Sequence, residues 1–154
     1  MRKLTLLFAL VIVSVSMSSC VFYKMIKFSN KEIQISNACE GEKIDFKLIS
    51  LIGDKDEQTM TLNCKIINRG VTKDIKIGGQ LMAYDCEGEA HSSSRTQTIR
   101  IKTDKKAIVA IPIPGQVLPK KVKKMAAIAF DVDDCRIEIK NVPVMWQKFK
   151  KEEK

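Results

Sequence analysis

In the stretch Met60-Thr61-Leu62-Asn63-Cys64-Lys65-Ile66, every second side chain is apolar. A period of two places successive side chains on opposite faces of an extended strand, so one face is apolar and the other is polar. The same alternation recurs in Ile44–Leu48, Ile75–Ile77 and Ile137–Ile139. These segments therefore predict half-buried antiparallel strands.

Residues typical of turns separate the alternating segments. Gly53-Asp54-Lys55-Asp56 and Asn68-Arg69-Gly70 lie between the first three segments, and Glu87-Gly88 follows the third. Short strands at this spacing, with no amphipathic helix among them, favour an all-β fold, a two-sheet antiparallel sandwich of about seven strands. The predicted strands cover residues 44–52, 58–68, 73–84, 95–103, 106–112, 122–132 and 135–145.

Three short segments carry further expectations about this sandwich. Val122–Phe130 contains alanines that also suit a helix, so its strand is the least distinct in the pattern. Gly78-Gly79, inside a predicted strand, indicates a bulge or bend. Ile33 and Ile35 are placed to form an additional edge strand.

The composition limits the function classes. The chain has 154 residues, 45% hydrophobic and 29% charged, with a formal net charge of +9. This length suits one domain, and this apolar content excludes a largely disordered chain. The single histidine excludes most sites that need two imidazoles, and no glycine-rich phosphate loop, paired CxxC or HExxH motif occurs. We expect neither an enzyme nor a cofactor.

The first twenty residues have the order of a bacterial export signal. Arg2 and Lys3 precede the apolar run Leu4–Val13, and small residues follow as far as Cys20. A signal peptide requires this succession of positive charge, short apolar helix and small residues. The run Met17-Ser18-Ser19-Cys20 resembles a bacterial lipobox, in which the cysteine is acylated, although leucine is usual at the position of Met17.

This resemblance implies a helical signal peptide over residues 1–19 and a lipid on Cys20. The exported protein would then be held by its lipid at a bacterial membrane, on the outer membrane or facing the periplasm. Two alternatives stay open, because cleavage near Ser18 would release a secreted protein and an uncleaved segment would act as an anchor. The uncharged stretch Leu4–Tyr23 has about the length that spans a bilayer.

Four motifs resemble telokin-like, immunoglobulin-like sandwich domains of small Bacteroides-type cell-envelope lipoproteins. They are Thr61–Gly70, Ala83–Gly88, Pro112–Val122 and Ile139–Val144. The resemblance implies an immunoglobulin-like sandwich over residues 43–146, after a lead-in over 20–42 and before a charged tail over 147–154. Families of this kind have mostly adhesive, accessory or unassigned roles, and the resemblance carries over no catalytic residue.

Four cysteines follow the signal segment: Cys39, Cys64, Cys86 and Cys135. An even number in an exported protein favours disulfides. We weigh a pairing of Cys64 with Cys135 and one of Cys86 with Cys39, against the alternative that Cys64 is a small buried apolar residue. No metal site is expected, because zinc favours CxxC pairs or several histidines.

The remaining polar candidates favour structural roles. The carboxylates match no calcium-loop spacing and read as turn residues: Asp85, Glu87, Asp131, Asp133 and Asp134. His91 adjoins Ser92, Ser93 and Ser94, and we expect a solvated loop there, because no strand-to-helix elbow holds a nucleophile. Trp146 is expected to cover the core and not to stack on a sugar.

The clearest functional candidate is a cluster of basic residues, Lys120, Lys121, Lys123 and Lys124. Export removes most nucleic-acid partners, and no aromatic side chains are interleaved to stack on bases. Anionic headgroups or an acidic glycan are the remaining ligands. A solvated surface that keeps the domain soluble is the favoured interpretation of the lysines, and binding of such a ligand is the hypothesis set beside it. We therefore expect a non-enzymatic envelope lipoprotein that acts as a binding or accessory module. The alternative is a structural component that contacts an envelope protein through exposed strand edges.

Overall fold

The alternating segments fold as strands. The computed structural model describes residues 33–37, 39 and 43–149. The strands of this part of the chain are β1 (Gln34–Asn37), β2 (Ile44–Asp54), β3 (Thr59–Asn68), β4 (Lys73–Asp85), β5 (Ala90–Ser93), β6 (Gln97–Ile101), β7 (Lys106–Ile113), β8 (Lys124–Val132) and β9 (Cys135–Gln147). None of these residues is helical, so the predicted all-β class is confirmed, and no described helix could span a membrane.

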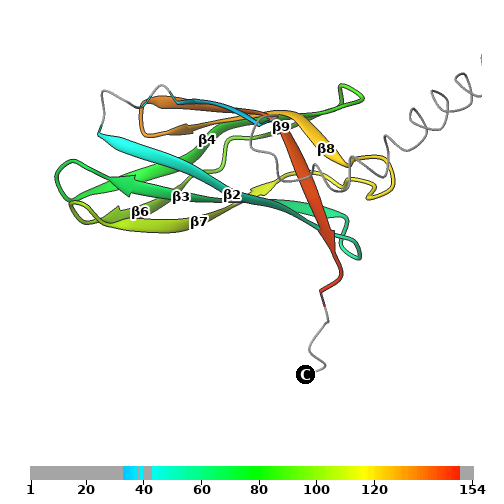
Figure 1. Ribbon diagram of the computed structural model, residues 1–154, viewed down its shortest axis with the longest axis horizontal. Coiled ribbons are helices and arrows are strands. Elements are labelled where there is room, and N and C mark those ends of the chain that lie inside the picture. The colour runs from blue at the N-terminus through cyan, green and yellow to red at the C-terminus, as the bar shows by residue number, and fades with distance from the viewer. Residues whose placement is uncertain (1–32, 38, 40–42, 150–154) are drawn as a thin grey trace, which may run out of the picture. The chain divides into compact units, whose positions relative to one another are not determined.

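The strands form one continuous sheet. Its order is β5-β4-β8-β9-β2-β3-β7, with β1 added to β9 and β6 added to β4. The sheet curls over itself, so that the half containing β4 and β8 lies over the half containing β2, β3 and β7 (Figure 1). All these strands belong to one compact unit, Ile33–Lys154.

Strand β9 joins the two halves. Its residues from Cys135 to Pro143 pair with β8 in antiparallel fashion, and the next residues pair with β2 in parallel, with Val144 opposite Leu51. Pro143 lies at the point where β9 changes partner, and proline has no N–H to donate to a ladder. One long strand therefore serves both halves.

The observed sheet differs from the prediction in three respects. The strands form one continuous curled sheet, whereas two separate sheets were expected. The expectation of purely antiparallel pairing is wrong at β2 and β9, because β9 runs past the end of β8 and continues along β2. The strand count is nine in the described residues instead of about seven. The additional strands are β5, which lacks an alternating apolar pattern, and β1, the edge strand that Ile33 and Ile35 indicated.

The core lies between the two halves of the curled sheet. Phe46 on β2 and Phe130 on β8 meet edge to face across it, with ring centroids 5.8 Å apart. The alternating residues of β3 point inward as predicted, and Leu62, Cys64 and Ile66 are fully buried. Cross-strand pairing places Cys64 between Leu48 and Val109.

Strand β4 bends at the predicted glycine pair. Its register with β8 shifts between Ile77 and Gly79 and again between Gly79 and Met82. Gly78 has a φ of 94°, a region that favours glycine. The bend divides the outer edge of β4, so that β6 pairs with the residues before it and β5 with the residues after it.

One disulfide ties the start of the described chain to the sheet. It joins Cys39 to Cys135, with Cα atoms 5.1 Å apart. Both pairings weighed from the sequence are therefore wrong. Cys64 and Cys86 are free thiols, because the core position of Cys64 and the turn position of Cys86 do not meet the other two cysteines. The expected signal peptide over 1–19, Cys20 and the end of the charged tail lie outside the described residues.

Candidate functional site

The predicted basic cluster lies on and beside one loop. We call residues 114–123 the lysine loop; it connects β7 to β8 at one end of the curled sheet (yellow in Figure 1). Lys120, Lys121 and Lys123 in the loop are exposed, whereas Lys124 is half-buried as the first residue of β8. The loop also exposes Leu118, with 48% of its surface accessible.

Buried anchors hold the lysine loop in place. Val117 and Val122 are both buried and belong to the core. The backbone N–H of Val117 donates to the carbonyl of Gln58 at 2.8 Å, and that of Val122 donates to Leu118 at 3.1 Å. These contacts turn the two valines inward, so the lysines between and beside them face solvent.

Trp146 fixes the end of the same loop. Its indole Nε1 donates to the carbonyl of Val122 at 2.6 Å, and the N–H of Val144 donates to the carbonyl of Lys123 at 2.9 Å. The indole packs against the core and lies over Gly53, where an added Cβ would overlap it. Trp146 thus covers the core, as predicted from the sequence.

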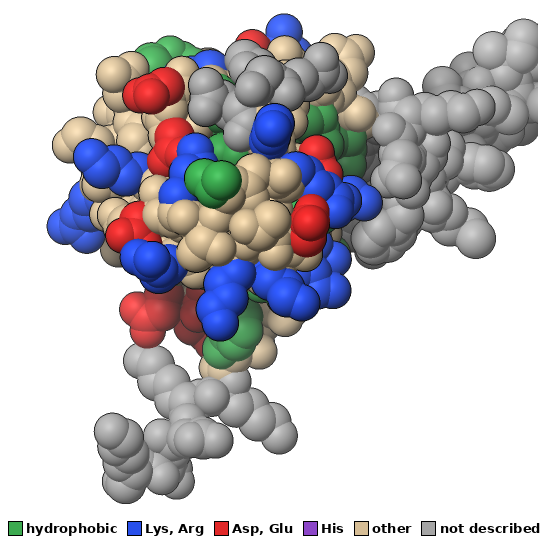
Figure 2. Space-filling view, turned by 90° about the vertical axis from the view of Figure 1, so that its left-hand side faces the viewer, with side chains coloured by type: hydrophobic (Ala, Val, Ile, Leu, Met, Phe, Trp, Pro, Cys, Tyr) green, Lys and Arg blue, Asp and Glu red, His purple; other side chains and the backbone are tan. Residues whose placement is uncertain are grey.

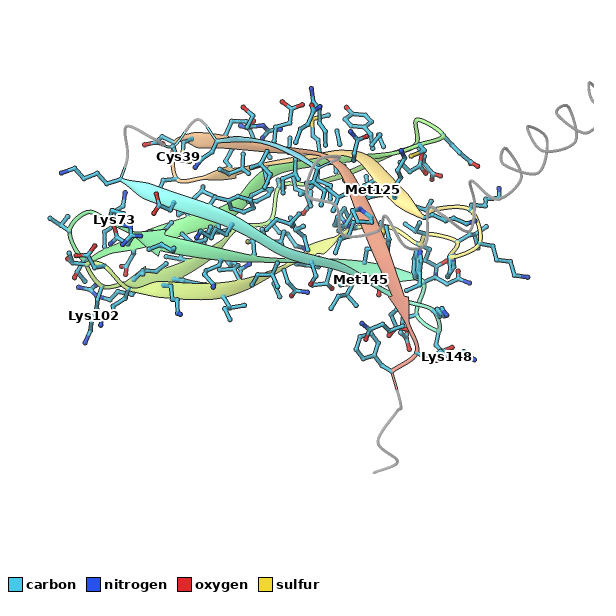
Figure 3. The ribbon with its side chains drawn as sticks, viewed as in Figure 1. Cys39, Lys73, Lys102, Met125, Met145 and Lys148 are labelled. Carbon is cyan, nitrogen blue, oxygen red and sulfur yellow. A yellow bond between two sulfur atoms is a disulfide. The ribbon has the colours of Figure 1, made fainter. Side chains whose placement is uncertain are left out.

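Several basic residues at the opposite end of the domain are paired with acids. Figure 2 shows that end, where Lys and Arg side chains are interspersed with Asp and Glu, and Figure 3 labels Lys73 and Lys102 there. Arg69 contacts Asp45 at 2.9 Å, and Lys73 contacts Asp133 at 2.8 Å.

The lysine loop differs from that end in its charge pairing. Within residues 33–37, 39 and 43–149, no ion pair joins Lys120, Lys121 or Lys123 to an acidic side chain. The positive charge of these lysines therefore stays available to an anionic ligand.

The predicted turn carboxylates do not gather into one site. Asp131 accepts a hydrogen bond from Arg136 at 2.8 Å. Asp133 accepts the N–H of Lys76 at 2.8 Å, and Asp134 is exposed in the turn between β8 and β9. Asp85 begins the turn from β4 to β5, at the other end of the sheet from these three along β4 and β8.

His91 corrects a further prediction. It is only 7% exposed and lies on β5 opposite Ala83, not in a solvated loop. Its Nδ1 is 3.1 Å from the carbonyl oxygen of Pro114, the first residue of the lysine loop. The sequence pattern gives no signal for this burial, because Ala90–Ser93 contains no large apolar residue.

A carboxylate pair accompanies His91. One ligand atom each from Asp85, Glu89 and His91 lies within 4.8 Å of the others. The sequence signal for this cluster is the spacing of its residues. Glu89 and His91 are two positions apart, so an extended chain places them on the same face of the hairpin as Asp85 across the turn. Glu87, which the sequence analysis grouped with Asp85, instead donates its backbone N–H to Oδ1 of Asp85 at 2.8 Å.

The two free thiols in the described part of the chain differ in environment. Burial raises the pKa of Cys64 to about 12, because the thiolate would have to be desolvated in the core. Cys86 is exposed in the turn after β4, with its Sγ 3.5 Å from the carbonyl oxygen of Lys124.

A small hollow opens where β4 bends. Its volume is about 190 Å³, below the roughly 300–1,000 Å³ typical of ligand pockets. Most of its lining is apolar or backbone, including Ile77, Leu81, Ile111 and Pro112, with Arg95 and Gln97 at its side. Ser93 and Thr96 complete its polar lining.

Two features of the edge strand β7 limit the addition of another strand. Its partner in the sheet is β3. On the other side, the Gln97 side chain donates to the carbonyl of Ala110 at 3.0 Å, and Pro112 has no N–H. These features hinder the addition of another strand.

Comparison with known proteins gives little support for a function. No protein family model matches the chain, and no curated protein matches it. The X-ray structure of Northeast Structural Genomics Consortium target SoR45 is similar over 81% of this chain and 95% of that chain, with 11% identity and a TM-score of 0.33. This similarity is too low to carry an argument.

Proposed function

We propose that this protein is a lipid-anchored, non-enzymatic accessory module of the bacterial envelope, and that its lysine loop binds anionic lipid headgroups. The observation that carries the proposal is the set of exposed lysines without acidic partners, Lys120, Lys121 and Lys123, on a loop fixed by buried valines. The curled sheet is assigned, in the same proposal, to the immunoglobulin-like sandwich class.

The chemistry of the loop favours a membrane surface over an acidic glycan. Leu118 is exposed beside the lysines, and a combination of apolar and cationic side chains suits the interface between headgroups and acyl chains. A polysaccharide would use the lysines but would gain little from Leu118. A lipid on Cys20 would hold the domain at such a surface, where even weak contacts are favoured by proximity.

The expected strength of this contact is modest. Each lysine near an anionic membrane contributes about 1 kcal/mol, so three exposed lysines give about 3 kcal/mol, or roughly a hundredfold in partitioning. Salt weakens the contact, because the Debye length falls from about 30 Å at 0.01 M to about 10 Å at 0.1 M.

Co-sedimentation with vesicles tests the proposal. The chain without residues 1–19, carrying Cys20→Ala, is mixed with phosphatidylglycerol vesicles at low salt. We expect binding that falls at least tenfold when Lys120, Lys121, Lys123 and Lys124 are changed to glutamine, and also when Leu118 is changed to serine.

A charge-matched variant provides the control. Changing Lys47, Lys102, Lys105 and Lys106 to glutamine removes the same charge from exposed positions outside the loop, and should weaken binding much less. Equal losses in the two lysine variants would contradict a specific role for the loop. Preference for an acidic polysaccharide over vesicles, with no effect of Leu118→Ser, would assign the loop to a glycan.

The anchor is tested separately by metabolic labelling with a fatty-acid probe. We expect label on the wild-type chain and none on Cys20→Ala. An unlabelled wild type would leave secretion or an uncleaved anchor as the explanation for the export signal. Docking of a partner strand on β7 is less favoured, because Pro112 has no N–H and Gln97 occupies the carbonyl of Ala110.

A further inference from the structure

We infer that Asp85, Glu89 and His91 form a binding site for one divalent transition-metal ion of the zinc class. Asp85 ends β4, Glu89 lies in the turn that follows, and His91 is on β5. One ligand atom from each residue lies within 4.8 Å of the others. This site is separate from the lysines and does not depend on the ligand that the lysine loop binds.

The hydrogen bonding of His91 leaves one ring nitrogen for a metal ion. A carbonyl oxygen only accepts hydrogen bonds, so the contact at 3.1 Å means that Nδ1–H donates to Pro114. Nε2 is buried and has no hydrogen-bond partner among the described residues. A histidine that donates one N–H to a backbone carbonyl and offers its other nitrogen is the arrangement that orients metal ligands.

Asp85 is also oriented by backbone contacts. Its Oδ1 accepts the N–H of Glu87 at 2.8 Å and that of Glu89 at 2.9 Å. The side chain is 97% buried, since only 3% of the residue is exposed. With Oδ1 engaged by the turn, Oδ2 is the oxygen that would bind the ion.

Strand pairing explains why the three groups converge. His91 is opposite Ala83, and two residues further along the hairpin the N–H of Asp85 donates to the carbonyl of Glu89 at 3.1 Å. Met125, labelled in Figure 3, pairs with Asp85 from β8 and is fully buried, so it forms an apolar floor.

Gly115 closes the other side of the imidazole. A Cβ at Gly115 would lie 2.9 Å from Nδ1 of His91, closer than a nonbonded carbon tolerates. The lysine loop can therefore approach the ring only with glycine at this position. His91 is thus held between the loop and β4, and an ion on Nε2 would link the β4–β5 turn to the lysine loop.

The donor set favours zinc over calcium or magnesium. Imidazole suits zinc and its neighbours, whereas calcium takes six to eight oxygen ligands. Three protein ligands with solvent in the fourth position give tetrahedral zinc. Two donor atoms that each lie about 2.1 Å from a tetrahedral ion are about 3.4 Å apart. The side chain of Glu89 is exposed and can rotate to bring its carboxylate to this distance.

Competition for zinc against a chromophoric chelator tests the site. The full chain is purified in a mild detergent, stripped of metal, and titrated with Zn²⁺ alone. We expect one saturable site per chain that Glu89→Gln weakens by about tenfold or more. Glu89 is exposed in a turn, so this substitution removes a ligand without disturbing the core.

Two control variants isolate the site. Glu87→Gln removes an equal charge from the same turn outside the cluster, and Cys86→Ser removes the exposed thiol; both should leave the zinc affinity within about threefold. Cobalt(II) should bind to the Cys86→Ser chain with a spectrum free of thiolate charge transfer. Equal affinity of wild type and Glu89→Gln, loss of binding in Cys86→Ser, or no saturable binding at all would overturn the site.

Discussion

At the scale of single residues, the burial of Cys64 changes the pKa of its thiol. Its side chain is fully buried between Leu48 and Val109, and the resulting desolvation raises the pKa of its thiol to about 12 from 9.0. In the unfolded chain the thiol is solvated and keeps an ordinary pKa. The two states therefore bind different numbers of protons at alkaline pH, which makes the free energy of unfolding depend on pH.

The sign of this dependence follows from proton counting. Below pH 9 the thiol is protonated in both states, and Cys64 does not make the free energy of unfolding depend on pH. Between pH 9 and about 12 the folded chain keeps the proton and the unfolded chain loses it, so rising pH destabilises the fold by up to about 1.4 kcal/mol per pH unit. We expect urea unfolding from pH 8 to 10.5 to show a steeper loss for the Cys86→Ser chain than for Cys86→Ser with Cys64→Ala. Parallel curves would show that the Cys64 thiol ionises in the folded state as readily as in the unfolded state.

At the scale of elements, β9 is the strand on which the fold depends most. It pairs with β8 and β1 in one half of the sheet and with β2 in the other. Asn141 has a φ of 58° just before the partner change, and this left-handed residue adds to the local turn of the strand. The contact between Trp146 and Gly53 secures the second pairing.

Gly53→Ala tests this contact. The added Cβ would overlap the indole of Trp146, so the ring must move and lose its hydrogen bond to Val122. We expect a loss of about 1–3 kcal/mol in the free energy of unfolding, together with a red shift of the fluorescence of the single tryptophan. Gly70→Ala is the matched control, because its Cβ would lie 3.4 Å or more from any neighbour and its effect should be small. Equal effects of the two substitutions would argue against close packing of Trp146 on β2.

The disulfide acts on β1 and β9 together. Cys39 follows β1, Cys135 begins β9, and the bond closes a loop with a sequence separation of 96. Changing both cysteines to alanine should cost about 2–4 kcal/mol, chiefly by freeing the unfolded chain. Chemical unfolding of wild type and double variant measures this cost, and reduction of the wild type should reproduce it. A double variant as stable as the wild type would mean that the bond contributes nothing to the free energy of unfolding.

At the scale of the whole molecule, the sequence pattern predicts where the strands lie better than it predicts which strands pair with one another. The alternation of Leu62, Cys64 and Ile66 sufficed to find β3, because inward and outward faces have different compositions. It could not show that β9 serves both halves, since pairing depends on where distant strands end. The same limit explains the cysteine error, because a disulfide depends on three-dimensional proximity.

The sequence likewise predicts one part of the candidate site and not the other. The four lysines could be identified because their charge is a local property of the sequence. The burial of His91 could not, because it depends on Ala83 opposite and on the approach of Gly115 from a loop that follows 24 positions later in the chain. A cluster assembled across a hairpin and a distant loop has only a weak signature in the sequence.

The shared strand also predicts how the domain unfolds. Because β9 contributes to both halves of the sheet and one core lies between them, neither half can separate without exposing the other. We therefore expect a single cooperative transition in urea. The fluorescence of Trp146 reports one end of the sheet, circular dichroism reports all strands, and alkylation of Cys64 reports the core. The three midpoints should coincide, and Gly53→Ala should shift them together. If Trp146 changed at lower urea than Cys64 became reactive, the pairing of β9 with β2 would be an independently melting element, and the two halves would fold as separate units.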